Sequence, residues 1–212
     1  MGIMAASMRR ASILVAALAA LALGSAFAAG EFRSKTADKY PAKQKQGDLI
    51  VAVKSFVSNK DQQSAFGKVR PYQHGIMPML LVLSNTGTNV YSLEKMQVRF
   101  ISGDRQSLEP IRGDDLASFN PDGHQPTRRN IPGVPGLSKT RVKKGPLNRP
   151  QITQNEFMAP IVTPKSTASG FLYYWTGTEA SLAGASAYIS GIYDITNGRE
   201  LFYFEIPLGR GK

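Results

Sequence analysis

The sequence predicts an all-β domain made of two packed antiparallel sheets, and three observations support this class. From residue 48 onward, apolar and polar residues alternate in short runs that are bounded by turn residues. Helical periodicity is nearly absent, and only residues 114–119 fit a single helical turn. The 212-residue chain contains no cysteine, so packing alone must hold the sheets together. Two sheets that bury one face against each other are the economical solution for such a pattern.

The first thirty residues are typical of an export signal. Arg9 and Arg10 precede an apolar run over residues 13–23, and small residues surround Ala26 and Ala28. We therefore expect residues 1–29 to be a signal peptide that is cleaved near Ala28, which places the product in the periplasm or outside the cell. The apolar run is too short to span a bilayer, so no transmembrane span is expected after cleavage.

The mature chain is predicted to begin with a flexible segment, residues 30–47, because that stretch is polar and rich in lysine. A single domain over residues 48–208 follows. Within it, Met96, Val98 and Phe100 alternate with polar residues and predict a half-exposed strand. The run over residues 79–83 is apolar on both faces and suits a central strand. The other predicted strands cover residues 48–57, 106–111, 155–162 and 170–175.

The last predicted element is a C-terminal hairpin. Asn197 and Gly198 form the dipeptide favoured in a two-residue type I′ turn, which would fix the register of both strands. In that register Thr196 faces Arg199 next to the turn, and the core face carries the pairs Tyr193–Phe202, Gly191–Phe204, Ile189–Ile206 and Ala187–Leu208. An aromatic run precedes this hairpin, and we expect Tyr173 and Trp175 to lie in the core rather than to form a sugar-stacking platform.

One long segment interrupts the strand pattern. Residues 120–150 contain a proline every few residues and carry a net charge of +6, out of +9 for the mature chain. The seven basic residues, opposed by Asp122 alone, are Arg128, Arg129, Lys139, Arg141, Lys143, Lys144 and Arg149. They are the candidate contacts to an acidic partner: anionic lipid headgroups, an envelope polysaccharide or an acidic protein. Export and the lack of interleaved aromatic residues argue against nucleic acid. The alternative is that the segment is merely a solvated surface loop.

A second candidate site contains sulfur and imidazole ligands. His74, Met77 and Met79 lie within six residues, and such ligands together suit Cu(I) in the periplasm. Residues two apart on a strand share a face, so Met77 and Met79 could equally be packing groups. A further cluster, from Asp104 to Asp122, offers oxygen ligands or acid–base groups but lacks the spacing of a calcium loop or a catalytic framework.

No enzyme motif is present in the sequence. There is no Gly-x-Ser-x-Gly elbow, no His-Glu-x-x-His and no phosphate-binding glycine loop, and the chain has two histidines. We therefore expect a protein that is not an enzyme and that needs no cofactor.

Several segments resemble a known class of domain. They are the apolar strand that runs from Gly75 into Ser84-Asn85-Thr86-Gly87, the following Ser92-Leu93 and Val98-Arg99-Phe100, residues 166–174, and residues 200–208. Together they resemble the Ig-like β-sandwiches of an uncharacterised family of exported bacterial proteins. The resemblance implies an Ig-like antiparallel β-sandwich of about seven strands with a long Pro-rich basic loop. It transfers no catalytic residue. The expected function is thus an exported adaptor that binds an acidic envelope component, and a sheet edge that accepts a strand could add to the contact. The alternative is a copper-handling periplasmic protein.

Overall fold

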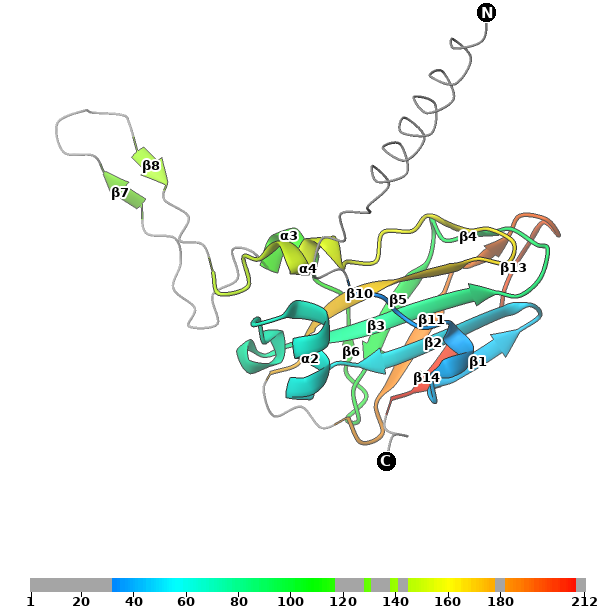
Figure 1. The fold of residues 1–212 in the computed structure, drawn as a ribbon, viewed down its shortest axis with the longest axis horizontal. Helices are drawn as coiled ribbons and strands as arrows, with labels where there is room; N and C mark the ends of the chain where they lie inside the picture. Colours follow the sequence, from blue (N-terminus) through cyan, green and yellow to red (C-terminus); the bar gives the residue numbers. More distant parts are fainter. Residues whose placement is uncertain (1–31, 117–127, 131–137, 141–144, 178–181, 209–212) are drawn as a thin grey trace, which may run out of the picture. The chain divides into compact units, whose positions relative to one another are not determined.

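The computed structural model describes residues 32–116, 128–130, 138–140, 145–177 and 182–208 (Figure 1). For residues 128–130 and 138–140 it describes the backbone. The expected signal peptide and most of the segment 117–144 therefore lie outside the described residues.

The described part of the chain is mostly β, as predicted. One sheet has the order β1-β2-β3-β10 and is antiparallel throughout; we call it the first sheet. Its strands are β1 (Lys43–Gln46), β2 (Leu49–Ser55), β3 (Ile76–Asn85) and β10 (Thr167–Trp175). The predicted central strand over residues 79–83 is confirmed, since it forms the middle of β3, which pairs with a strand on each side (Figure 1).

Two further antiparallel sheets have four strands each. The second sheet has the order β14-β11-β5-β6, and the third has the order β13-β12-β4-β9. The second comprises β14 (Phe204–Pro207), β11 (Ser186–Ser190), β5 (Gln97–Ile101) and β6 (Ser107–Leu108). The third comprises β13 (Arg199–Glu200), β12 (Tyr193–Asp194), β4 (Tyr91–Ser92) and β9 (Ile161–Val162). A separate pair, β7 (Arg128–Asn130) and β8 (Ser138–Thr140), forms a hairpin.

The helices are short. They are α2 (Asn59–Phe66), α3 (Gly113–Leu116) and α4 (Pro150–Gln154), together with the 3-10 turns η1 (Ala37–Lys39) and η2 (Pro71–His74). The helical turn expected within residues 114–119 is confirmed in part by α3, and residues 117–119 lie outside the described residues. The strand expected over residues 155–162 is wrong for most of its length, because pairing there is limited to β9 and one bridge at Glu156.

Strands β2, β3 and β10 of the first sheet bury side chains on both faces, which gives the domain two cores. Alternate residues of β3, such as Met79 and Leu81, point into a core shared with the second sheet, the inter-sheet core. Their neighbours Leu80 and Val82 point into the helical-side core, which Phe66, Leu116, Leu147 and Ile152 complete. The continuous apolar run of β3 follows from this arrangement, because a strand covered on both faces has no polar side.

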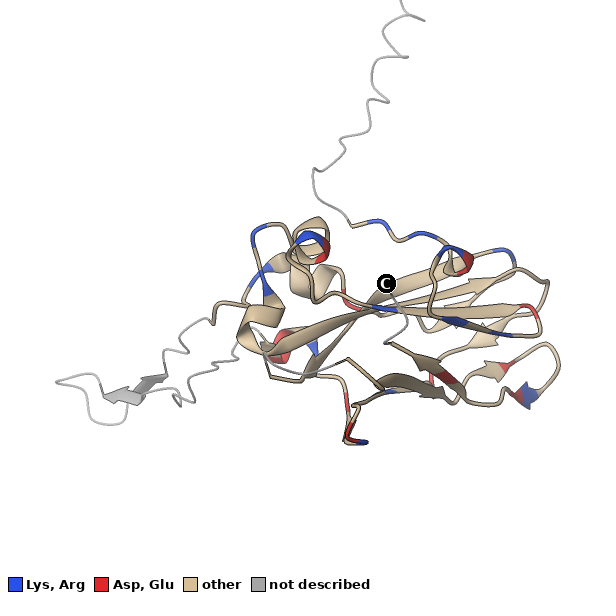
Figure 2. Cartoon of the chain, turned by 90° about the horizontal axis from the view of Figure 1, so that it is seen from below, with Lys and Arg blue, Asp and Glu red and all other residues tan. Residues whose placement is uncertain are grey.

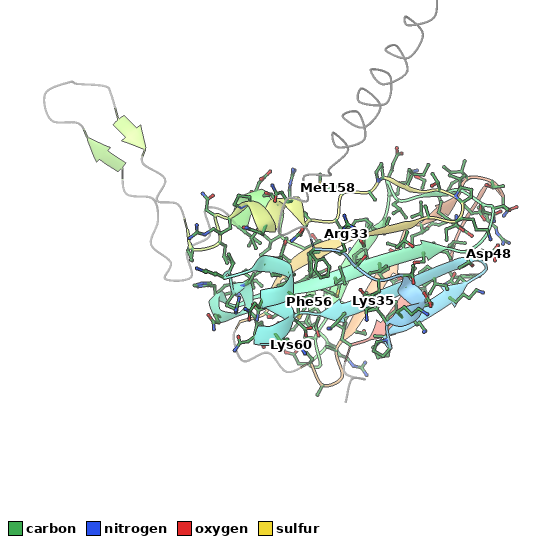
Figure 3. All side chains as sticks on the ribbon, in the orientation of Figure 1. Arg33, Lys35, Asp48, Phe56, Lys60 and Met158 are labelled. Carbon is green, nitrogen blue, oxygen red and sulfur yellow. The ribbon has the colours of Figure 1, made fainter. Side chains whose placement is uncertain are left out.

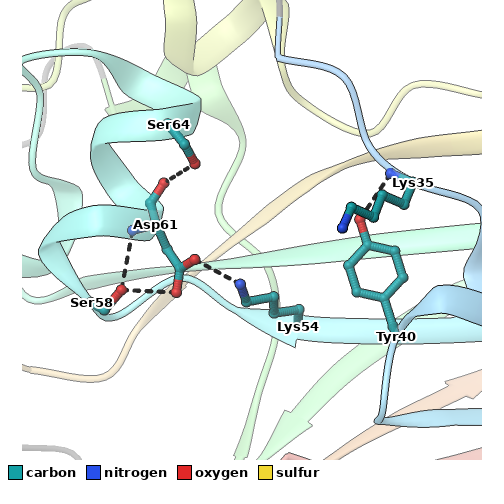
Figure 4. A network of polar contacts seen from close by, with 6 residues as sticks. All are labelled: Lys35, Tyr40, Lys54, Ser58, Asp61 and Ser64. Atoms are coloured by element: carbon teal, nitrogen blue, oxygen red, sulfur yellow. Dashed lines mark hydrogen bonds and ion pairs between the residues drawn. The ribbon is translucent and has the colours of Figure 1, made fainter.

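Helix α2 is tied to the first sheet by a polar network around its N-terminus (Figure 4). The Ser58 hydroxyl accepts a hydrogen bond from the Asp61 backbone N–H at 3.1 Å and donates to the Asp61 carboxylate at 2.8 Å. Lys54, on β2, lies 2.6 Å from the same carboxylate. Partial burial alone would raise the pKa of Asp61, but the hydrogen bonds from Lys54 and Ser58 outweigh it and leave the pKa lowered.

The predicted register of the C-terminal hairpin is wrong. Tyr193 pairs with Glu200, and Ile189 pairs with Phe204, so the strands are shifted by two residues from the type I′ register. The connection between Asp194 and Arg199 has four residues instead of two. The buried Asp194 carboxylate explains it, because this group accepts hydrogen bonds from the Asn197 backbone N–H at 3.0 Å and the Asn197 side chain at 2.8 Å.

The predicted core face of this hairpin is correct on one side of Gly191 and wrong on the other. Ala187, Ile189, Phe204 and Ile206 are buried as expected. Gly191 has a φ of +74° and separates β11 from β12. Beyond it, the alternation of buried and exposed side chains shifts by one residue. Ile192 and Asp194 point inward there, whereas Tyr193 is 42% exposed and Phe202 is 85% exposed.

The N-terminal segment also differs from expectation, because residues 32–47 are ordered into elements instead of forming a flexible leader. Ala37 is fully buried, and its backbone N–H donates to the Ser84 hydroxyl at 2.9 Å. Phe32 packs against Phe56 and Phe171, with ring centroids 5.7 and 5.1 Å apart. Figure 3 shows Arg33, Lys35 and Phe56 along this part of the molecule. The buried side chain of Ala37 and the ring contacts of Phe32 anchor the segment to the domain.

Of the aromatic pair expected in the core, Tyr173 is buried and Trp175 is not. Tyr173 has no exposed surface, and its hydroxyl donates to the Ile152 carbonyl at 2.7 Å. Trp175 is 46% exposed because β10 ends there, beyond the cover of both cores. Tyr174 is also fully buried, since its side chain enters the inter-sheet core.

Candidate anion-binding groove

The structure describes one of the seven predicted basic contacts in full. Arg128 and Arg129 lie on β7 and Lys139 lies on β8, where Arg129 pairs with Lys139 along the backbone. Arg141, Lys143 and Lys144 lie outside the described residues. Arg149 is exposed and stands directly before α4.

Arg149 lines a groove in which every charged side chain is basic. The groove has a volume of about 460 Å³ and lies between η2 and the residues around α4. Its lining residues are Phe66, Gly67, Lys68, Val69, Arg70, Gln73, His74, Pro146, Arg149, Pro150 and Gln151. We call it the cationic groove, because it joins three permanent cations and a histidine with no carboxylate in the lining. Figure 2 shows several basic residues on the turns next to the helices.

One wall of the groove is built by the exit of α2. Gly67 caps the helix with a φ of +64°, and its backbone N–H donates to the Gln63 carbonyl. The chain then turns through Lys68 to Arg70, whose guanidinium donates to the Gly67 carbonyl at 2.5 Å and to the Val69 carbonyl at 3.0 Å. The side chain of Arg70 is thereby folded onto its own turn, and it is half-buried.

The opposite wall is the entry to α4. Leu147 is fully buried in the helical-side core and anchors the chain just before Arg149. The two walls are joined by the Asn155 side chain, which donates to the Ala65 carbonyl at 2.8 Å. Buried Gln62 accepts from the Tyr72 backbone N–H at 3.0 Å and donates to the Val57 carbonyl at 3.1 Å. These bonds fix the spacing of the two walls that carry the basic side chains.

The residue pattern of the groove suits an anion. Arg70 keeps guanidinium donors that its two carbonyl contacts do not use, and guanidinium donors match carboxylate and phosphate oxygens in pairs. Lys68 and Arg149 are exposed, so they act as mobile charges at the mouth. Sequence reasoning missed Lys68 and Arg70. A usable signal was present, since the chain has no acidic residue between Asp61 and Glu94.

The three predicted copper ligands are divided between two environments. His74 is the last residue of η2 and lines the cationic groove. Met77 and Met79 are fully buried in the inter-sheet core, where they act as packing groups. Among the described residues, no three His, Cys, Asp or Glu side chains gather in a way that could hold a metal ion.

Two sheet edges are covered at the positions that the structure describes. Along β10, the Phe171 backbone N–H donates to the Asn155 carbonyl at 2.7 Å, and the Phe157 N–H donates to the Phe171 carbonyl at 2.9 Å. Along β14, side chains of β1 take the place of a strand. Gln44 accepts from the Glu205 N–H, and Gln46 donates to the Tyr203 carbonyl, both at 3.0 Å. These positions are closed to an added strand.

The comparisons with known proteins assign no family. No family model matches the chain, and no curated protein matches it. A solved structure from Bordetella pertussis, of a protein that carries the name ApaA, is similar over 79% of this chain and 98% of its own. The sequence identity is 14% and the TM-score is 0.30, a level that assigns neither fold nor function. Within the described residues, no helix is both long and apolar enough to cross a membrane.

Proposed function

We propose that the protein is an exported, non-enzymatic binding module of the cell envelope that contacts an acidic partner through the cationic groove and the basic segment 120–150. The observation that carries the proposal is the lining of the groove, in which Lys68, Arg70, His74 and Arg149 meet with no carboxylate. The basic segment leads into this groove through Arg149. Its net charge of +6 enlarges the same positive surface.

The wider setting is part of the proposal. The n-region, apolar run and cleavage motif of residues 1–29 support export, and the absence of cysteine agrees with a fold that relies on packing. Two antiparallel sheets that share a core support an Ig-like sandwich, with a helical layer added on the outer face of the first sheet. Such a scaffold would hold the groove rigid and leave the basic segment to reach the partner.

The binding mode follows from the exposure of the charges. Lys68 and Arg149 are solvated, so their attraction for an anion is screened by salt and falls steeply above about 0.15 M ionic strength, where the Debye length is about 8 Å. Arg70 is half-buried and preorganised by its carbonyl contacts. It would lose less side-chain entropy on binding and would set the geometry of the contact.

The test is binding of the mature chain to the isolated cell envelope, measured by co-sedimentation over a series of NaCl concentrations. The variant Lys68→Gln/Arg149→Gln should bind several-fold more weakly and show a shallower dependence on salt. A deletion of residues 124–144 should weaken binding further. The deletion stops there because Leu147 is fully buried and needed for folding.

The matched control is Lys45→Gln/Lys95→Gln, which removes the same charge from two exposed lysines outside the groove. It should bind like the unmodified chain if the groove itself is the contact. If both double variants weaken binding equally, the loss of binding comes from the change in net charge, and the groove is not the contact site. If binding does not depend on salt concentration, the proposal of an acidic partner is wrong.

A further inference from the structure

A second hollow, of about 1000 Å³, lies between the β1–β2 turn and the β12–β13 hairpin. Figure 3 shows Asp48, in that turn, at the far end of the strands from Lys60 on α2. The hollow is lined by Gln44, Gln46, Gly47, Asp48, Asn89, Tyr91, Asp194, Arg199, Glu200, Leu201, Phe202 and Tyr203. It shares no lining residue with the cationic groove. We call it the acidic hollow, because three carboxylates face a single arginine in a chain whose formal charge is +11.

The polar groups of the acidic hollow fall into two sets. Asp194 is buried, and its oxygens are taken by Asn197 and by the Asn89 side chain at 3.0 Å, so it is structural. Gln44 and Gln46 are held by the edge of β14. Asp48 and Glu200 are exposed, and their carboxylates accept no hydrogen bond from the described side chains or backbone. These two groups are open to a ligand.

A negative field is present inside the hollow. Burial raises the pKa of the Tyr91 hydroxyl, and the nearby charges of Asp194 and Asp48 raise it further. The same field that disfavours a tyrosinate favours a cation at this position. Arg199 offsets it in part, since it lies close enough to Asp194 to lower the pKa of that carboxyl.

Two exposed aromatic residues line the hollow, and Tyr188 covers one face of the Tyr203 ring. Phe202 is 85% exposed and Tyr203 is 53% exposed. The Tyr203 ring is held in place by stacking on Tyr188, with centroids 5.1 Å apart. Phe202 lies just beyond the change of phase at Gly191, so its exposure is imposed by the backbone. Aromatic faces beside carboxylates attract organic cations through the ring quadrupole and the ionic charge together.

We propose that the acidic hollow binds a basic segment of a partner polypeptide. A lysine or arginine side chain would lie between the carboxylates of Asp48 and Glu200 and the rings of Phe202 and Tyr203. Charge complementarity selects the cation. The size of the hollow favours a peptide over a free amine, because a small amine would fill only part of a volume of about 1000 Å³. This site is independent of the proposed contact at the cationic groove.

The experiment is an NMR titration of the mature chain with a soluble heptapeptide that contains two lysines, one arginine and one leucine. We expect saturable shifts of the amide signals of Asp48, Glu200 and Phe202. The same peptide with glutamine at its three basic positions should cause none. The variant Asp48→Asn/Glu200→Gln should weaken binding by about fivefold or more, and Phe202→Ala by about two- to fivefold.

Matched controls separate the site from general charge and surface effects. Glu94→Gln/Glu109→Gln removes the same charge elsewhere, and Met158→Ala removes an apolar side chain that is 72% exposed and lies outside the hollow. Both should bind the peptide normally. Shifts that map to other residues, or that the two hollow variants leave unchanged, would overturn the proposal. If spermidine binds as tightly as the peptide and causes the same shifts, the ligand is a free polyamine. The proposal of a polypeptide partner would then be wrong.

Discussion

At the scale of single residues, the course of the C-terminal hairpin is decided by two positions. Asp194 is 1% exposed and closes the four-residue connection through its bonds to Asn197. Burial would raise the pKa of this carboxyl, but the hydrogen bonds from Asn197 and Asn89 outweigh it, so the pKa is lowered and the group stays ionised. Gly191 then sets which side chains beyond it face the solvent.

The role of Gly191 can be tested by adding one methyl group. A Cβ at this position would lie 2.1 Å from the Lys95 carbonyl oxygen, and the φ of +74° disfavours any L side chain. Gly191→Ala should lower the free energy of unfolding by about 3 kcal/mol, from backbone strain and overpacking together. Urea denaturation followed by circular dichroism measures this change.

Gly198→Ala serves as the comparison for that substitution. Gly198 has a similar φ of +64°, but a Cβ there would meet only the Tyr193 hydroxyl at 3.9 Å. The cost should be about 1 kcal/mol, from the backbone conformation alone. If both substitutions lower the free energy of unfolding equally, the close approach of the Lys95 carbonyl to Gly191 does not contribute to the effect of Gly191→Ala.

At the scale of elements, α2 depends on its N-terminal network more than on its own composition. Its sequence, NKDQQSAF, has a weak apolar face, and most of its contact with the domain comes through Gln62, Ala65 and Phe66. Ser58→Ala removes the cap and one bond to Asp61, and it should lower the free energy of unfolding by about 1 kcal/mol.

Ser64→Ala provides the matched change within the same helix (Figure 4). The Ser64 hydroxyl donates to the Asp61 carbonyl one turn back, a contact that competes with the helical backbone bonds. Because alanine has the higher helix propensity, Ser64→Ala should be neutral or slightly stabilising. A loss of stability equal to that of Ser58→Ala would show that the cap contributes nothing specific.

The elements that sequence reasoning recovered are those with a local signal. Alternation identified β5, and the continuous apolar run identified β3, because both patterns follow directly from which faces are covered. Helix α2 was missed because its burial comes from contacts with η2 and the α4 region, which no local pattern encodes. The type I′ turn failed for a similar reason, since a buried Asp194 outside the dipeptide changed the connection.

The residues of the cationic groove also divide into those with a local sequence signal and those that only tertiary packing brings together. Arg149 was predicted because it lies in a basic run, whereas Lys68 and Arg70 are about 80 positions away and join it only through tertiary packing. The acidic hollow was not predicted at all. Its residues come from β1, the β1–β2 turn, β4 and the residue Asn89 before it, the β12–β13 hairpin and residues 201–203 between β13 and β14, and the exposure of Phe202 depends on the backbone of Gly191.

At the scale of the whole molecule, the first sheet separates two cores, and each core is covered by different elements. The second sheet covers one face, and the helices with the N-terminal segment cover the other. Phe171 lies on the helical side, within 4.8 Å ring-centroid distance of both Phe56 and Phe66. The groove and the hollow lie in the surroundings of different cores, so a change that loosens one core should spare the site beside the other.

Adjacent leucines on β3 test this division, since Leu81 points into the inter-sheet core, Leu80 into the helical-side core, and both are fully buried. Each Leu→Ala substitution should lower the free energy of unfolding by about 3 kcal/mol, measured by urea denaturation. A two-layer sandwich with a solvated outer face predicts instead that Leu80→Ala costs little. A near-neutral Leu80→Ala would therefore contradict the existence of the helical-side core. It would also contradict the packing that is inferred to hold Arg149 opposite Lys68.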